Sequence, residues 1–223
     1  MPRTERVDVG GLVYHVTNRS NGRHTIFDAN EAYNSFEIIL VDAKTRFDMR
    51  ILAYVLMPNH WHLLIYPKED GDLSAYVAWL TNTHTRRYHV MTGTVGGGHL
   101  YQGRYKSFLV GSDRHLLTVL KYIERNPVRA KLSKLPESWR WGSAYRRIHG
   151  KTEEKKLLAS SPVPLPSGYG EWIHTPEPTE ELAAIRSSVN KGIPYGRKTW
   201  RDRIITKYSL EQVLRPPGRP KKS

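Results

Sequence analysis

The sequence predicts an α+β fold for residues 1–150, with one antiparallel sheet and helices on one face. Short runs rich in β-branched and aromatic residues alternate with longer segments whose apolar residues recur at helical spacing. Gly, Pro and Asn residues separate these runs. The resulting order is β-α-β-β-α-β followed by a helix, which matches the ferredoxin-like split βαβ arrangement.

Four segments are predicted to be strands. Leu12–Val16 is short, β-branched and aromatic, and Tyr105–Val110 has a similar composition. Between them in the chain lie Arg50–Met57 and His60–Tyr66, which only Pro58-Asn59 separates. Two apolar runs with so short a connection predict a hairpin with a tight turn.

Three segments are predicted to be helices. Residues 30–47 and 73–88 carry apolar side chains at helical spacing, and Asp28 or Asn30 is expected to cap the first of them. A third helix is expected to begin with Asp113 as its cap and to run to about Asn126. Pro127 should stop or bend it, because proline cannot continue the helical hydrogen bonding.

The composition changes after residue 150. Residues 151–180 include a stretch rich in proline and serine, which predicts an extended linker. Residues 181–223 are expected to form a basic DNA-binding extension, with short helices over 180–190 and 199–207. Residues 187–223 hold ten Lys or Arg residues against two acidic ones.

Composition narrows the class of protein. The chain has 223 residues, of which 39% are hydrophobic, and it has no cysteine. A disulfide framework and a thiolate metal site are therefore excluded. No run approaches 18 apolar residues, and the first residues lack the apolar segment of a secretion signal. We therefore expect a cytoplasmic, nucleoid-associated protein with no membrane partner.

The charge points to a polyanionic partner. Lys and Arg number 35 against 21 Asp and Glu, which gives a net charge of +14. An excess of this size favours nucleic acid over a membrane surface as the partner.

His60 and His62 are the first candidate site residues. Side chains of a strand alternate between its faces, so the two imidazoles should project from the same face. Together they can share one divalent cation, in an open site with room for water and substrate oxygens. The alternative is a pair of histidines that serve only packing or surface roles.

Tyr122 and Asn126 form the second candidate pair. They are four residues apart on a predicted helix and so should lie on one face. A phenol with a pKa near 10 is a poor nucleophile unless the electrophile or a nearby cation assists it. The Asn126 amide oxygen is a suitable third metal ligand. The alternative for Tyr122 is a half-buried ring that packs the helix on the sheet.

Basic residues near these pairs are candidates for phosphate binding. Lys121, Arg125 and Arg129 belong to the same helical segment as Tyr122. Arg104 and Lys106 precede or begin the fourth predicted strand. Exposed basic residues are often merely solvated, which is the alternative for each of them.

Several motifs occur together in a fixed order. They are Tyr14-His15-Val16-Thr17-Asn18-Arg19, Met57-Pro58-Asn59-His60-Trp61-His62, Gly103-Arg104-Tyr105-Lys106-Ser107, Tyr122-Ile123-Glu124-Arg125-Asn126-Pro127-Val128-Arg129-Ala130 and Trp139-Arg140-Trp141-Gly142-Ser143-Ala144-Tyr145. In this order they resemble the REP-associated tyrosine transposases, bacterial relatives of the single-tyrosine HUH transposases. The resemblance spans roughly residues 10–147 and resumes in the closing basic segment.

The resemblance implies an HUH endonuclease fold and a mechanism. His60 and His62 would be metal ligands, Asn126 would be the third ligand, and Tyr122 would be the nucleophile. The metal would be Mg²⁺ or Mn²⁺. The implied substrate is single-stranded DNA that folds into hairpins, namely repetitive extragenic palindromes, cleaved through a 5′-phosphotyrosine intermediate. The resemblance implies no small-molecule substrate, and we expect a monomer, with a dimer as the alternative.

The closing segment is expected to bind DNA through Arg215, Arg219, Lys221 and Lys222. Gly218-Arg219-Pro220 resembles the core of motifs that lie in narrow A·T-rich minor grooves. The alternative is a solvated basic tail that contacts phosphates without selectivity.

Three other functions remain open at this point. One is a DNA-binding protein derived from a transposase without catalysis. The second is another HUH class, a replication initiator or relaxase, although these usually use a further His or acid as third ligand. The third is a metallohydrolase in which the histidine pair activates water, which would leave free 5′-phosphate ends.

Overall fold

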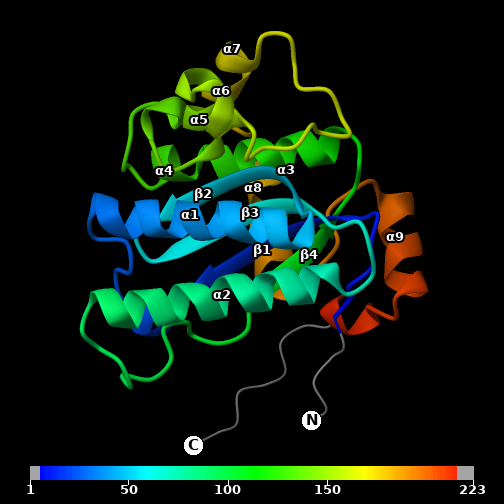
Figure 1. Ribbon diagram of the computed structural model, residues 1–223. Coiled ribbons are helices and arrows are strands. Elements are labelled where there is room, and N and C mark those ends of the chain that lie inside the picture. The colour runs from blue at the N-terminus through cyan, green and yellow to red at the C-terminus, as the bar shows by residue number, and fades with distance from the viewer. Residues whose placement is uncertain (1–5, 215–223) are drawn as a thin grey trace, which may run out of the picture.

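The chain folds around one four-stranded antiparallel sheet (Figure 1). The computed structural model describes residues 6–214. The strands are β1 (Val13–Arg19), β2 (Arg50–Met57), β3 (His60–Tyr66) and β4 (Lys106–Val110). They lie in the order β2-β3-β1-β4, which is the order of a ferredoxin-like split βαβ unit. The predicted α+β class is therefore confirmed.

Helices cover both faces of the sheet, whereas the sequence predicted them on one face. The helices are α1 (Asn30–Phe47), α2 (Asp72–Met91), α3 (Arg114–Glu124), α4 (Asn126–Arg129), α5 (Ser143–His149), α6 (Thr152–Lys155), α7 (Tyr169–His174), α8 (Thr179–Lys191) and α9 (Lys198–Lys207), with 3-10 turns η1 (Asn21–Arg23), η2 (Pro136–Ser138) and η3 (Glu211–Leu214). The two helices of the split βαβ unit, α1 and α2, pack together on one face as expected. Helix α3 packs on the opposite face, against β2, β3 and β4. Within residues 6–214, no helix combines the length and apolar character needed to cross a bilayer.

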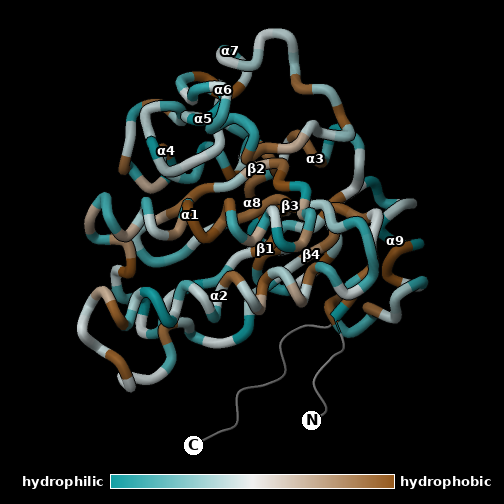
Figure 2. The backbone as a smooth tube through the Cα atoms, in the orientation of Figure 1, coloured by the Kyte–Doolittle hydropathy of each residue, from teal (hydrophilic) through white to brown (hydrophobic). Residues whose placement is uncertain are grey.

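The second layer of helices exists because the strands are apolar on both sides. In β2, Tyr54 and Leu56 belong to the core under α1 and α2, whereas Ala53 and Val55 belong to the core under α3. Figure 2 shows hydrophobic residues concentrated along the central strands. The alternation of side chains along the strands therefore divides most of their apolar residues between two cores.

The ends of two helices test the predicted capping residues. Asp113 caps α3 as expected, because its side chain accepts a hydrogen bond from the His115 backbone N–H at 2.9 Å. The predicted cap of α1 is wrong: Ala29 precedes that helix and no side chain caps it. The predicted bend before Pro127 is confirmed, since α3 ends at Glu124 and α4 begins two residues later.

The segment after residue 150 packs onto the sheet unit. The stretch expected to be an extended linker contains α6 and α7, and its Ile173 and Glu177 are buried. The expected short helices correspond to α8 and α9. Beyond α8, the Tyr195 backbone N–H donates to the Leu109 carbonyl at 2.8 Å, and the Gly111 N–H donates to the Tyr195 carbonyl at 2.8 Å. Residues 179–214 thus lie along the outer side of β4.

Neighbouring isoleucines on α1 give a test of the core under α1 and α2. Ile39 is fully buried, whereas the Ile38 side chain is 55% exposed. We expect Ile39→Ala to lower the free energy of unfolding by about 2–4 kcal/mol, because it removes buried carbon atoms and leaves a cavity. Ile38→Ala should change it by no more than about 0.5 kcal/mol. Denaturant unfolding measures both, and equal losses would contradict the assigned faces of α1.

Candidate active site

His60 and His62 lie on the same face of β3, as the alternation predicts. Their ring centroids are 5.1 Å apart. Trp61 between them belongs to the core under α1 and α2 on the opposite face. The two imidazoles therefore face the side of the sheet that α3 covers.

Each imidazole is oriented by a hydrogen bond at Nδ1. The His60 Nδ1 is 2.6 Å from Asn59 Oδ1, and the His62 Nδ1 is 2.9 Å from His15 Nε2. Within residues 6–214, neither Nε2 atom makes a hydrogen bond, so both remain for a ligand. Burial lowers the pKa of His60 to about 3, with Arg19 adding to the effect, and burial holds the pKa of His62 well below its usual value. Both rings are therefore neutral near pH 7, which is the form that binds metals.

His15 is a site residue that the sequence did not reveal. Its side chain is fully buried and stacks on Phe108 with ring centroids 4.7 Å apart. Its Nδ1 has no hydrogen-bond partner among the described residues. If His62 presents the Nε2 lone pair to a metal, its proton lies on Nδ1 and is donated to His15 Nε2. This tautomer of His62 requires His15 to carry its own proton on Nδ1.

Tyr122 lies beside this histidine cluster in the same chain. Its ring centroid is 6.1 Å from that of His62 and 6.4 Å from that of His15. The side chain is 7% exposed. Burial raises the pKa of Tyr122, and the nearby positive charge of Arg129 opposes the increase. The phenol is therefore protonated near pH 7.

Asn126 follows Tyr122 across a break between two helices. The expected helical spacing from Tyr122 is interrupted at Arg125, where α3 ends and α4 has not begun. Asn126 is half-buried, and its side chain makes no hydrogen bond within residues 6–214. The same residues contain no group of three or more His, Cys, Asp or Glu side chains arranged to hold a metal.

Two residues expected to bind phosphate are held inside the protein instead. The Arg125 guanidinium donates to Glu177 Oε2 at 3.0 Å and to two backbone carbonyls of the α7 segment. The Lys121 ammonium lies 4.9 Å from the centre of the Trp172 ring. The expectation of DNA contact is therefore wrong for Arg125 and Lys121, because later parts of the chain cover their side of α3.

Arg129 contacts Tyr122 directly. These contacts make Arg129 a residue that positions Tyr122. Its guanidinium carbon lies 4.3 Å from the centre of the Tyr122 ring, and one of its nitrogens donates to the Tyr122 carbonyl. Another nitrogen donates to Glu177 Oε1 at 2.5 Å. The Glu177 side chain is 2% exposed, so this ion pair is buried. Glu177 thereby fixes both arginines that follow the nucleophile candidate.

A basic cavity of about 450 Å³ opens beside His62. Among the described residues, its walls include four cationic side chains and no acidic one, and the cations are Arg19, Arg23, Arg104 and Lys106. Arg104 and Lys106 are exposed and were expected from the sequence. Arg19 was missed, although the register pairs it directly with His60 across β1 and β3. The lining suits a phosphodiester, whose charge the cations would neutralise.

The remaining expected DNA contacts, Arg215, Arg219, Lys221 and Lys222, lie outside the described residues.

Comparisons with known proteins relate this chain to a transposase family. The family profile described as "Transposase IS200 like" matches residues 8–126. A curated protein of Haemophilus influenzae, named as a REP-associated tyrosine transposase, is 23% identical over 123 residues, which cover 52% of this chain and 70% of that protein. A solved structure of a REP-associated tyrosine transposase bound to a REP hairpin superposes with a TM-score of 0.56 at 19% identity, over 66% of this chain and 86% of that one. The last likeness shows the shared fold.

The buried ion pair at Glu177 gives a test of how α3 and α4 are held. Glu177→Gln removes the charge that pairs with Arg125 and Arg129, and leaves one buried and one half-buried cation without a counterion. We expect the free energy of unfolding to fall by about 3 kcal/mol. Glu180→Gln, at an exposed position at the start of α8, is the matched control and should have little effect. Equal effects in denaturant unfolding would show that the Glu177 pair contributes nothing to stability.

Proposed function

Because the chain belongs to the IS200-like transposase family, we propose that it cleaves and rejoins single strands of hairpin-forming DNA through a covalent bond to Tyr122. The observation that carries the proposal is the position of the Tyr122 ring, 6.1 Å from the ring of His62 within one chain. The basic cavity beside His62 supplies a place for the scissile phosphate. The net charge of +14 suits a polyanionic substrate.

The residues fit a divalent cation such as Mg²⁺ or Mn²⁺. His60 and His62 are neutral, and each is oriented through Nδ1 with Nε2 free of protein partners among the described residues. We assign Asn126 as the residue that completes the protein ligands, since its half-buried amide follows the nucleophile on α4. When bound, the cation would polarise the scissile phosphate and neutralise the charge that develops on it.

Cleavage follows from the roles of the chain's own groups. The Tyr122 hydroxyl oxygen attacks phosphorus and loses its proton, while the bond between phosphorus and the 3′-oxygen breaks. The leaving oxygen gains a proton, which gives a 5′-phosphotyrosine and a free 3′-hydroxyl. Arg129 stabilises the developing phenolate through its charge beside the ring. The tyrosyl ester conserves the energy of the broken bond, so a second 3′-hydroxyl can displace Tyr122 without ATP.

We assign hairpin DNA as the substrate because a relative of the same fold was solved with a REP hairpin. The histidines and Tyr122 come from one chain, which supports action by a single copy. The residue four positions after Tyr122 is Asn126 and not a His or an acid, which favours this class over a replication initiator or relaxase.

The nucleophile is tested by Tyr122→Phe. We expect this variant to bind flanked hairpin oligonucleotides and to form no covalent adduct, because it lacks the attacking oxygen. A denaturing gel with end-labelled DNA measures the adduct. Tyr145→Phe, on α5, is the control and should form the adduct normally. An adduct that persists in Tyr122→Phe would move the nucleophile elsewhere, and product ends with a free 5′-phosphate and no adduct would indicate a metallohydrolase.

Metal dependence is tested by removal of the ion and of its ligands. We expect EDTA to abolish cleavage, and added Mg²⁺ or Mn²⁺ to restore it. His60→Ala and His62→Ala should each lose both cleavage and Mn²⁺ binding measured by electron paramagnetic resonance. His149→Ala, at an exposed histidine on α5, should retain both. Full cleavage by the native protein in EDTA would remove the metal from the mechanism.

His15 is tested as a positioning residue for His62. His15→Phe keeps an aromatic ring against Phe108 and removes the nitrogen that bonds His62 Nδ1. We expect Mn²⁺ affinity to fall about 10- to 100-fold, which is the usual effect of losing such a partner. His84→Phe changes another buried histidine away from the site and should leave Mn²⁺ affinity unchanged. If both variants bind Mn²⁺ equally well, His15 serves packing alone.

A further inference from the structure

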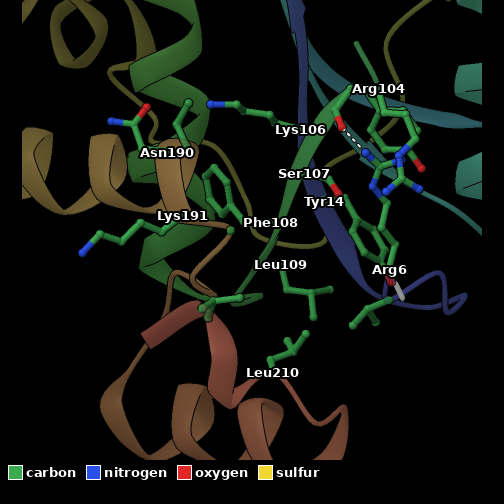
Figure 3. Close-up of a pocket in the computed structure, with 15 residues that line it drawn as sticks. Arg6, Tyr14, Arg104, Lys106, Ser107, Phe108, Leu109, Asn190, Lys191 and Leu210 are labelled. Atoms are coloured by element: carbon green, nitrogen blue, oxygen red, sulfur yellow. Dashed lines mark hydrogen bonds between the residues drawn. The ribbon is translucent and has the colours of Figure 1, made fainter. Parts of the chain in front are cut away.

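A second cavity lies between β4 and the residues that follow α7 (Figure 3). Its volume is about 420 Å³. One wall is the β4 segment that carries Phe108 and Leu109, and the facing wall is formed by the end of α8 and by η3. Figure 3 shows Lys106 extending from β4 toward the part of α8 that carries Asn190. We call this cavity the β4 recess.

The β4 recess combines an apolar interior with a cationic rim. Apolar side chains come from both walls, and they include Phe108, Leu109, Val189, Leu210 and Val213. Of residues 6–214, four cationic side chains also line it and no acidic one does; the cations are Arg6, Arg104, Lys106 and Lys191. A ligand that suits both features has a flat apolar part and a negative charge. A nucleotide has both, in its base and its phosphate.

The recess is continuous with the candidate active site. Four residues line both the recess and the cavity beside His62, and they are Arg104, Lys106, Val189 and Asn190. A DNA strand with one phosphate near His62 would therefore run next to the shared cations, Arg104 and Lys106. Its neighbouring nucleotide would then reach the apolar interior of the recess.

We infer that the β4 recess binds one unpaired nucleotide of the DNA strand adjacent to the scissile phosphate, with its base in the apolar interior and its phosphate at the shared cations. The position of this nucleotide relative to the cleaved bond rests on the proposed function. The facing wall of the recess belongs to residues 189–213, which follow the region that matches the transposase family. The extension therefore contributes to recognition of the single strand.

The test uses the full chain with Tyr122→Phe, so that binding is measured without cleavage. The probe is a fluorescent DNA hairpin with an oligothymidine flank, in which each flank position in turn is made abasic. We expect one position to weaken binding about tenfold when its base is removed, because a buried base contributes roughly that much. Other positions should show smaller effects.

A cavity-filling variant identifies the recess as the place of that base. Val213→Trp fills the interior, and it should weaken binding of the complete probe about tenfold while the abasic probe binds as before. Leu214→Trp is the matched control, since this neighbour is 53% exposed and does not line the recess. Leu214→Trp should bind the complete probe about tenfold more tightly than the abasic probe, as its parent does. Thermal unfolding checks that both variants fold.

Three results would overturn the inference. The first is a flank with no position sensitive to base removal. The second is an abasic effect of equal size in Val213→Trp and its parent. The third is a gain in flank binding when residues 215–223 are deleted, which would make the tail the occupant of the recess. If the native protein with Tyr122 intact forms no tyrosyl adduct while the abasic effect in Tyr122→Phe is present, the catalytic proposal alone is overturned and the recess is supported as a DNA site.

Discussion

The packing of α3 on one face of the sheet is the constraint on which the candidate site depends. Leu116, Val119 and Ile123 are fully buried in that contact and fix the rotation of the helix. Successive residues of a helix differ by about 100° around its axis, so rotation by one position would carry Tyr122 away from His62. The nucleophile candidate and the imidazoles therefore meet only while this apolar contact is in register.

The site places two opposite electrostatic demands on the same buried region. Metal ligation needs neutral imidazoles, and burial provides this by lowering the pKa of His60 and His62. A phenolic nucleophile needs to lose its proton, and burial opposes this by raising the pKa of Tyr122. Arg129 acts against the second effect through its contact with the Tyr122 ring, while Glu177 prevents it from becoming an uncompensated buried charge. Glu177, which is remote from Tyr122 in sequence, thus stabilises the positive charge that lies beside the nucleophile.

Much of this arrangement follows from patterns within single elements. The alternation along a strand is local, so the sequence was enough to predict that His60 and His62 share a face. The contribution of His15 was not predictable in this way, because it depends on the register between β1 and β3. In that register Thr17 lies opposite His62, which makes His15 a diagonal neighbour across the strands.

Tertiary contacts also explain the wrong expectations. Arg125 belongs to a basic stretch typical of phosphate binding, yet Glu177 and the α7 carbonyls, about 50 residues later, take its hydrogen bonds. No local signal predicts which face of α3 a distant segment will cover. We predicted that Tyr122 and Asn126 share one face because we expected one continuous helix. Pro127 cannot continue that helix, and α3 ends before it.

Later segments of the chain also form backbone hydrogen bonds with the two outermost strands of the sheet, β2 and β4. On β2, the Leu56 backbone N–H donates to the Trp141 carbonyl at 2.8 Å, and Ile51 accepts from the Ala159 N–H at 2.8 Å. On β4, Tyr195 bonds the backbone at Leu109. An unprotected outer strand is a template for pairing with another polypeptide and so for aggregation. At these positions the backbone groups already pair within the chain, so two copies cannot join there into one continuous sheet.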